Sequence, residues 1–350
     1  MLLIFCAIII CFESLQGNYE SALNHMQCGL QIFRNWQTGA DKPSLPAMAM
    51  SSPHHQSVDN ELVQMFSRLN MQTLLFPDTH LFSTDFVKQD VRLAMDPFPG
   101  VFASLNEARD CLDNYMSYEI QSLVAAYLNR QDSENDSHEG PVQDSTTSDL
   151  LLRWSAAFDA FVTKAGPSLK PKDLQGARLL EIQYDCAKIM LSAGMPPKET
   201  VFDAFEALFE NIVSTATSII SRSNPSGRSE RTCQVSFENG LVPPLYFTAT
   251  RCRNPWIRRQ ALSLLSSTPR LEGIWNSAML SKIAEQLILI EEERDYIEQV
   301  TRSEDILATS RLSVLQATIY SEKGQVLVEC FQQKCGLDGK ICLLDEWISY

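Results

Sequence analysis

The chain has 350 residues, of which 45% are hydrophobic, so it is not a wholly disordered protein and can bury one large core or two smaller ones. Its 43 acidic residues outnumber its 29 basic residues and give a formal net charge of −14. Because nucleic-acid binding draws most of its affinity from lysine and arginine, this charge excludes a surface that is basic as a whole. We therefore expect no direct contact with DNA.

The first twelve residues, MLLIFCAIIICF, are almost entirely apolar and allow two interpretations. They could be the apolar region of a signal peptide, or a fully buried helix of the core. No lysine or arginine precedes them, the first basic residue is Arg34, and no small-x-small cleavage site follows. The run is also shorter than the roughly 20 residues that span a bilayer. We favour the buried helix and expect neither secretion nor membrane insertion.

A second helix is predicted directly after the first. Gly17 breaks the chain, and Asn18 can cap a helix that ends near Trp36. Two helices joined by so short a connection should form an antiparallel hairpin. Residues 38–57 are rich in Gly, Pro and Ser and predict a loop, and a third helix is predicted over about 58–75.

The middle of the chain also has helical character. Residues 76–103 mix prolines and glycines with aromatic side chains and predict a packed loop. Ser104 and Glu107 have the spacing of a capping box, which predicts a helix that ends near Arg130. Further helices are predicted over about 150–164, 171–193 and 197–221, with Pro171 and Pro197 in first turns and Gly194 at a helix end.

Two polar segments, 131–149 and 222–232, interrupt these helices. The first holds no large apolar residue except Val142. Such composition is typical of solvated, mobile linkers. We expect one large domain over residues 1–350 with these two linkers inside it.

The last third of the chain changes its period. Asn254 can cap a helix with Pro255 in its first turn, and a long helix is predicted from about Trp275 to Thr301. Apolar residues then alternate over 312–320, EKG can turn, and 325–331 is strand-like. The predicted fold class is all-α, a bundle-like array of helices with a small C-terminal β-hairpin.

Five arginines lie close together in sequence, at Arg251, Arg253, Arg258, Arg259 and Arg270. They could bind phosphate, since two helix starts lie nearby. They could equally pair with carboxylates and fix the packing of helices. In so acidic a chain we favour pairing.

The sequence offers no catalytic, cofactor or metal residues that we would assign. Its ten cysteines are scattered, without a CxxC pair, and most lie in apolar runs where a reduced thiol behaves as a small hydrophobe. Cys330, Cys335 and Cys342 supply one thiol fewer than a closed zinc site needs, so we interpret them as core residues of the hairpin. His54, His55 and His80 fall in predicted loops, and no HExxH or GxSxG motif occurs.

Three blocks of sequence resemble the regulatory region of fungal binuclear zinc cluster transcription factors. They are residues 4–33, residues 240–293, and the terminal hairpin followed by LLDEWISY, in the order that this family uses. The second block is the most specific. Its signature residues, which we expect to be structural, are Cys252, Arg253, Pro255, Arg258, Arg259, Pro269, Arg270, Glu272, Gly273 and Trp275.

The resemblance implies an all-helical regulatory domain, a role in transcription, and a place in the nucleus or the cytoplasm. It also implies binding as the mode of action, with a small-molecule effector or a protein partner and no cofactor. The family's DNA-binding module holds two zinc ions with six closely spaced cysteines, and this sequence contains no such cluster. Two alternatives follow: the sequence is a truncated one, or the protein has lost the module and acts through a partner, such as a heterodimer with an intact zinc cluster factor.

An alternative from a different class is a helical scaffold that serves as an enzyme or carrier in a fungal biosynthetic pathway, for example a terpene cyclase. Such an enzyme needs clustered carboxylates that hold magnesium against a diphosphate. Asp110 with Asp113, and the run Glu291–Glu293 with Asp295, are the nearest candidates. The partner motif of Asn, Ser and Glu is missing, and the glutamate run is typical of a solvated helix surface. We favour the regulator.

Overall fold

A computed structural model of the chain describes residues 2–38, 65, 98–131, 145–194, 198–223, 233–236, 240–267, 269–293, 300–333 and 341–350. Contacts divide the chain into two compact units. The first contains residues 1–45, 50–81 and 226–350, and the second contains residues 46–49 and 82–225. The predicted helix 58–75 lies almost wholly outside the described residues, as do the loop 39–57 and His54, His55 and His80.

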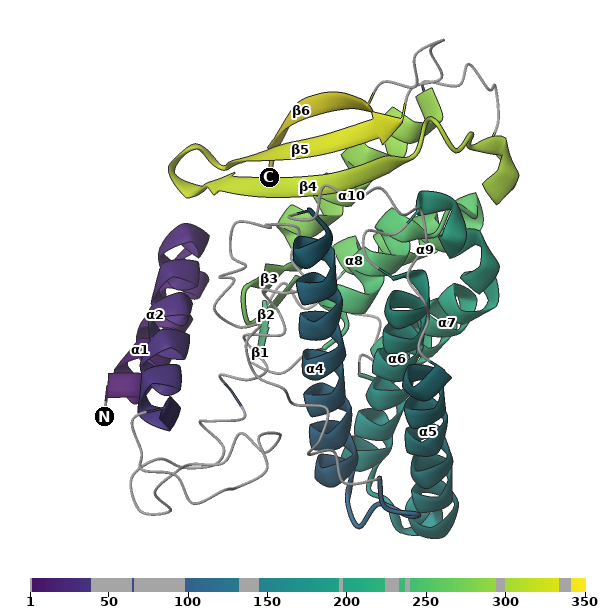
Figure 1. The fold of residues 1–350 in the computed structure, drawn as a ribbon. Helices are drawn as coiled ribbons and strands as arrows, with labels where there is room; N and C mark the ends of the chain where they lie inside the picture. Colours follow the sequence, from purple (N-terminus) through teal and green to yellow (C-terminus); the bar gives the residue numbers. More distant parts are fainter. Residues whose placement is uncertain are drawn as a thin grey trace. The chain divides into compact units, whose positions relative to one another are not determined.

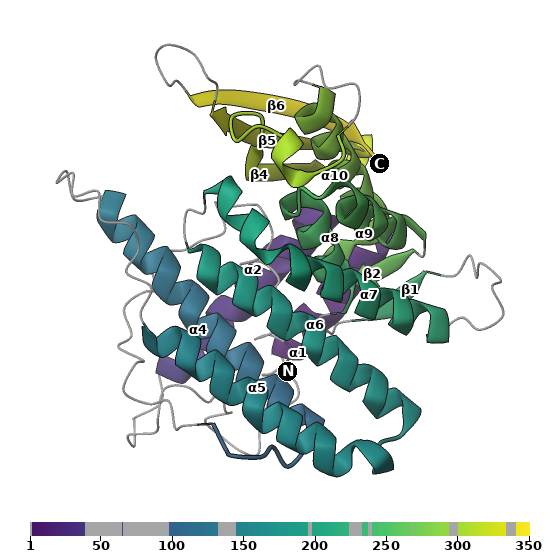
Figure 2. The same cartoon turned by 90° about the vertical axis from the view of Figure 1, so that its right-hand side faces the viewer.

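The second unit is helical. Its described elements are α4 (Leu105–Gln131), α5 (Ser145–Ala165), η4 (Gly166–Ser168), α6 (Pro171–Ala193), η5 (Glu199–Phe205) and α7 (Glu206–Ser223). The four α-helices lie side by side in Figure 2, with α6 in contact with the other three. Trp154 anchors the interior, since its ring stacks on Phe158 and Tyr184 and its indole N–H donates to the Ala108 carbonyl at 2.8 Å.

Several helix ends in this unit follow the predicted signals. Pro171 opens α6, and Gly194 closes it with a positive φ of 71°. The Ser104 hydroxyl accepts from the Glu107 N–H at 3.1 Å, as one half of a capping box would. Two boundaries differ from the prediction: η5 replaces the expected first turns of α7, and α5 begins at Ser145, inside the segment 131–149. Residues 132–144 and 224–232 of the two predicted linkers lie outside the described part.

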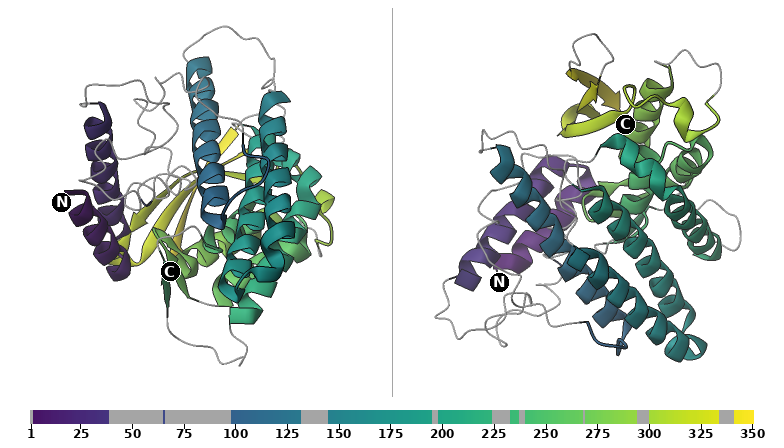
Figure 3. Two further views of the ribbon diagram at one scale, coloured as in Figure 1. Left: turned by 90° about the horizontal axis from the view of Figure 1, so that it is seen from below. Right: turned by 45° about the vertical axis from the view of Figure 1, so that its right-hand side comes forward.

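The first unit starts with the predicted helical hairpin, α1 (Leu2–Gln16) and α2 (Tyr19–Thr38). Gly17 turns the chain with a φ of 80°, and the Asn18 carbonyl accepts the first helical bond from Ala22. Figure 3 shows the two helices as a neighbouring purple pair. The expectation of a fully buried first helix was wrong, because one side of α1 packs on α2 while large apolar side chains on its opposite side are exposed.

The rest of this unit combines α8 (Val242–Arg251), α9 (Pro255–Ser267) and α10 (Ser277–Glu293) with two small sheets. The first sheet was not predicted. It joins β1 (Gln234–Ser236) in parallel to β2 (Arg270–Glu272), which pairs in antiparallel with β3 (Trp275–Asn276).

This sheet corrects the predicted start of the long helix. Trp275 lies in β3, and α10 begins at Ser277. Gly273 turns the chain between β2 and β3 with a φ of 61°, and the Asn276 side chain then caps α10 by accepting from the N–H groups of Ala278 and Met279. The described helix ends at Glu293, and residues 300 and 301 are not helical.

The predicted C-terminal hairpin is confirmed. β4 (Leu312–Tyr320) and β5 (Gln325–Gln333) pair in antiparallel through the turn η7 (Ser321–Lys323), and Gly324 closes the turn with a φ of 59°. A third strand, β6 (Ile341–Ser349), pairs with β5, and the short turn η6 (Ser303–Asp305) precedes β4. Figure 1 shows this sheet in yellow beside α10. The fold is thus mostly α with a small sheet at the C-terminus, and no described helix has the length and apolarity needed to cross a membrane.

Candidate functional site

The signature arginines meet the glutamates of α10 in the interior of the first unit. Arg253, in the connection between α8 and α9, donates from Nη2 to Oε1 of Glu291 at 2.6 Å. Arg258, in the first turns of α9, donates from Nη1 to the other oxygen of Glu291 at 2.8 Å. All three side chains are buried. Two guanidinium groups thus neutralise and hydrogen-bond a carboxylate that lies deep in the protein, which offsets the free-energy cost of burying its charge.

The ion pairs continue from this buried centre to the surface. Arg258 also donates from Nη2 to Glu292 at 2.7 Å, and the second oxygen of Glu292 accepts from Arg259, whose side chain is half exposed. We call Arg253, Arg258, Arg259, Glu291 and Glu292 the Arg–Glu ladder. It confirms that these arginines pair with carboxylates. It also corrects the interpretation of the glutamate run as a solvated surface, since α10 turns Glu291 toward the arginines of its neighbours.

The ladder also fixes the C-terminal sheet. The backbone N–H of Leu312, the first residue of β4, donates to Oε1 of Glu291 at 2.8 Å, and the Leu312 carbonyl accepts from Arg253 at 3.3 Å. A further donor of Arg253 reaches the Arg251 carbonyl at 2.9 Å. One buried carboxylate therefore joins α10, the α8–α9 connection and β4.

A second buried carboxylate holds the start of α8. Glu272, at the end of β2, accepts from the backbone N–H groups of Leu241 and Val242 at 3.1 and 2.8 Å. These are donors that a helix leaves unpaired at its N-terminus. Burial raises the pKa of Glu272, and the donated N–H groups and Arg270, 4.0 Å away, oppose that shift only in part. Gly240 leaves the space for this carboxylate, because a Cβ there would lie 2.3 Å from its Oε1.

The other signature residues shape the same region. Pro255 opens α9, where the Asn254 side chain caps the helix by accepting from the N–H of Trp256 at 3.0 Å. Trp275 is buried edge-on against Tyr246, with ring centroids 6.0 Å apart. The Cys252 N–H ends α8 on the Thr248 carbonyl, and the Pro269 carbonyl accepts from Gln234 of β1. The structure brings the signature residues together as contacts between elements.

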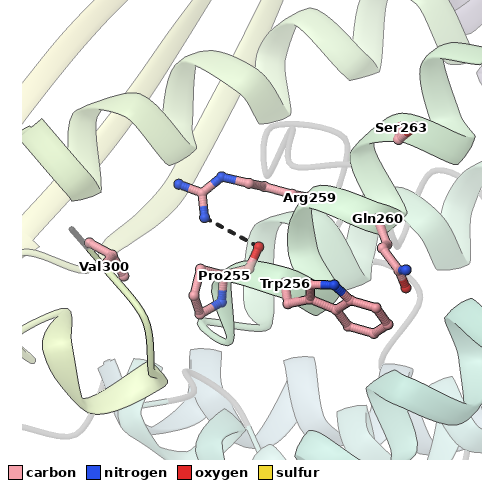
Figure 4. Close-up of a pocket in the computed structure, with 6 residues that line it drawn as sticks. All are labelled: Pro255, Trp256, Arg259, Gln260, Ser263 and Val300. Atoms are coloured by element: carbon pink, nitrogen blue, oxygen red, sulfur yellow. Dashed lines mark hydrogen bonds between the residues drawn. The ribbon is translucent and has the colours of Figure 1, made fainter.

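A shallow hollow of about 430 Å³ lies next to the ladder, on the surface of α9 (Figure 4). Its lining residues are Pro255, Trp256, Arg259, Gln260, Ser263 and Val300. Trp256 is 62% exposed, and Arg259 crosses the hollow to donate to the Pro255 carbonyl at 3.3 Å. Among the described residues that line this hollow there is no carboxylate, and Arg259, the charged one among them, is already paired with Glu292.

The residues considered for catalysis or metal binding do not form a site in the described part of the chain. Glu291 and Glu292 are occupied by arginines, Asp110 and Asp113 lie on α4 in the other unit, and Asp295 is outside the described residues. Within those described residues, no three side chains of the His, Cys, Asp and Glu types come together as metal ligands. Cys330 is buried, which raises the pKa of its thiol to about 12, whereas the side chains of Cys335 and Cys342 are not described.

Two partners in this region were not found from the sequence. Glu291 lies 38 residues from Arg253 and 33 from Arg258, so no local spacing joins them. Asn276 caps α10 and its amide also donates to the hydroxyl of Tyr19, 257 residues away. The sequence carried one relevant signal. α10 has more glutamates than lysines and arginines, and glutamates that become buried are normally paired with cations from elsewhere in the chain.

Comparison with known proteins gives one informative similarity. The chain is 22% identical, over 371 aligned residues that include 83% of its length, to the aspercryptin biosynthesis cluster-specific transcription regulator atnN of Emericella nidulans. The chain spans 58% of the length of that relative. No protein-family model matches the sequence. No solved structure matches it either.

Proposed function

We propose that this chain is the regulatory part of a fungal transcription regulator of the binuclear zinc cluster type. The observation that carries this proposal is the similarity to a cluster-specific transcription regulator over 83% of the chain. The three blocks that resemble the family, residues 4–33, residues 240–293 and the terminal sheet, all fall within the first unit. Control of a biosynthetic gene cluster, as in the name of that relative, is part of the proposal.

The geometry of the Arg–Glu ladder supports a binding protein rather than an enzyme. Each carboxylate of Glu291 and Glu292 is held between arginines, and Glu291 is held also by a backbone N–H, so neither is available as a base or as a metal ligand. Catalytic groups need an open position beside them for the reacting atom. A network whose charges satisfy one another instead gives a rigid body on which a surface can recognise a partner or an effector.

The mechanism we propose is regulation by contact in the nucleus. This acidic chain does not touch DNA through the described residues; it acts on promoters by binding a partner that does, such as a zinc cluster factor with an intact DNA-binding module. A small-molecule effector would change that contact. Trp256, exposed beside Arg259, is the residue at which we place contact with a protein partner, because exposed tryptophans are over-represented among the residues that dominate interfaces.

The experiment that tests this proposal joins the chain to an unrelated DNA-binding module and measures transcription of a reporter in a filamentous fungus. We expect a change in transcript level of at least about tenfold, and nuclear fluorescence when the chain carries a fluorescent tag. The variant Trp256→Ala tests the proposed point of contact. It leaves the ladder intact and should reduce the change in transcript level. A reporter that responds no more than to the DNA-binding module alone, together with exclusion from the nucleus, would overturn the proposal.

A further inference from the structure

Helix α1 is apolar on two opposite sides, and among the described elements it makes its extensive contact with α2. Leu3, Cys6 and Ile10 are buried against α2. The opposite side exposes five large apolar side chains, each between 48% and 61% exposed: Ile4, Phe5, Ile8, Phe12 and Leu15. We call these five residues the α1 face. A helix that is hydrophobic all round is normally covered on all sides, so the α1 face requires an occupant.

The spacing of the α1 face is that of helix-to-helix packing. Ile4, Ile8 and Leu15 of the face, with the partly buried Cys11 between the last two, follow one another at intervals of four, three and four residues, which is the seam of a heptad repeat. Phe5 and Phe12, seven residues apart, widen the seam on one side. The face therefore matches another helix with a similar stripe.

The charges around the α1 face favour an identical partner. α1 carries no basic residue, and its acidic residue, Glu13, accepts from the Asn18 amide at 2.8 Å away from the exposed stripe. A partner chosen by charge would find nothing here to bind. An uncharged apolar stripe, in contrast, meets its own copy without burying a charge, as two-fold symmetric interfaces require.

The area of the α1 face is also sufficient for a dimer. Five half-exposed side chains offer about 500 Å² per copy, since a large apolar side chain covers roughly 150–250 Å². Contact between two copies then buries about 1,000 Å², which reaches the lower bound for a specific interface. Such a patch is at the upper end of what monomers expose.

We propose that the α1 face is the interface between two copies of this chain. The α1–α2 hairpin of each copy packs against the other around a two-fold axis, and the four helices form a bundle with the α1 faces at its centre. This inference does not depend on the proposed role in transcription, because it concerns how the chain associates and not what it regulates.

The test is the mass of the whole chain in solution, measured by sedimentation equilibrium from about 0.1 to 100 µM. The natural chain is expected to be a dimer. Ile8→Glu, which places a charge at the centre of the seam, is expected to weaken the dimer by more than about 100-fold. Leu152→Glu is the matched control, because Leu152 on α5 is 55% exposed against 57% for Ile8, and this variant should remain dimeric.

A second measurement keeps the test decisive if Ile8→Glu folds poorly. Hydrogen exchange of the natural chain should slow in residues 2–16 as the concentration rises through the dimerisation range. A monomeric natural chain would overturn the proposal. In a monomeric chain, a lower melting temperature of Ile8→Glu would mean that another segment of the same chain packs on the α1 face. Binding of the chain to neutral phosphatidylcholine vesicles would mean that this face meets a lipid surface. A dimer that survives Ile8→Glu, or exchange in α1 that ignores concentration, would overturn it as well.

Discussion

At the scale of single residues, Glu291 links α10 to α9 and to β4 within the first unit. Its carboxylate accepts from Arg253, Arg258 and the backbone of Leu312, and it is 3% exposed. Its contribution does not lie in the strength of one ion pair. It lies in the cost of the alternative, because Arg253 and Arg258 would each lose a buried carboxylate partner, while Arg258 would keep Glu292.

We predict that Glu291→Gln lowers the free energy of unfolding by about 3–5 kcal/mol, the range for loss of one partner from a buried ion pair. Glu285→Gln on the same helix is the control, since Glu285 pairs with Lys282 on the surface and such pairs contribute at most about 1 kcal/mol. Urea denaturation of both variants measures the difference. Equal losses in the two variants would show that burial of the ladder has no energetic consequence.

Gly240 offers a second test at this scale. Gly240→Ala would push a methyl group into the Glu272 carboxylate and break its bonds to the start of α8, so we predict a loss of about 1–3 kcal/mol. Gly176→Ala is the control, because the new Cβ would meet only Leu105 Cδ1 at an ordinary 3.8 Å and alanine favours the helix by about 0.5–1 kcal/mol. Thermal denaturation separates the two, and the prediction fails if both variants gain stability.

At the scale of elements, the sequence predicts well where a local signal exists. Pro171 and Gly194 bound α6, and the alternation before EKG gives the hairpin of β4 and β5. It predicts poorly where the cause is distant. The strands β1, β2 and β3 are two or three residues long and carry no period, so nothing local distinguishes them from helix ends.

Burial was the harder part of the candidate site to predict. The sequence predicts that Glu291 and Glu292 are solvated, because a charged run on a helix is usually exposed. Their burial depends on α9, which packs beside α10. The apolar run of α1 is ambiguous for the opposite reason. A helix that is hydrophobic on every side gives no direction from which to infer its packing, so its exposed face became visible only in the structure.

The cap of α10 provides a prediction at this scale. Asn276 accepts from two helical N–H groups, and its amide donates to Tyr19 of α2. Asn276→Asp keeps the acceptor but loses the donor, whereas Asn276→Ala loses both. We expect Asn276→Ala to lose about 1 kcal/mol more than Asn276→Asp, the usual value of a cap. Urea denaturation tests this order, and a reversed order would contradict it.

The turn before β4 should respond to acid. Hydrogen bonds from the backbone of Thr301 and Arg302, and from the Thr301 hydroxyl, hold the pKa of Asp305 below its ordinary value. A carboxyl with a lowered pKa adds stability above its ordinary pKa, and this addition is lost as the pH falls through the lowered value. The stability difference between the natural chain and Asp305→Asn should therefore shrink in acid. Denaturation from pH 7 to pH 3 checks it, and a constant difference would contradict it.

At the scale of the whole molecule, the two compact units pose the question of cooperativity. We predict from the sequence that residues 1–350 behave as a single domain. Calorimetry should then show one transition in which the calorimetric and van't Hoff enthalpies agree. Both enthalpies are calculated for the dimer if the chain is a dimer at the concentration used. Two separated transitions, or a calorimetric enthalpy well above the van't Hoff value, would mean that the units unfold independently.

The Arg–Glu ladder has a consequence for how this protein can change over generations. The ladder and the strand that it holds come from three places in the chain: Arg253, Glu291 at 38 residues beyond that arginine, and β4, which starts 59 residues beyond it. Each of the three is destabilised when another is lost. A single substitution at Glu291 would destabilise the fold. Simultaneous replacement of the glutamate and its arginines by apolar residues of similar volume need not do so. Among homologues of this protein, Arg253, Arg258 and Glu291 should be either all conserved or all replaced.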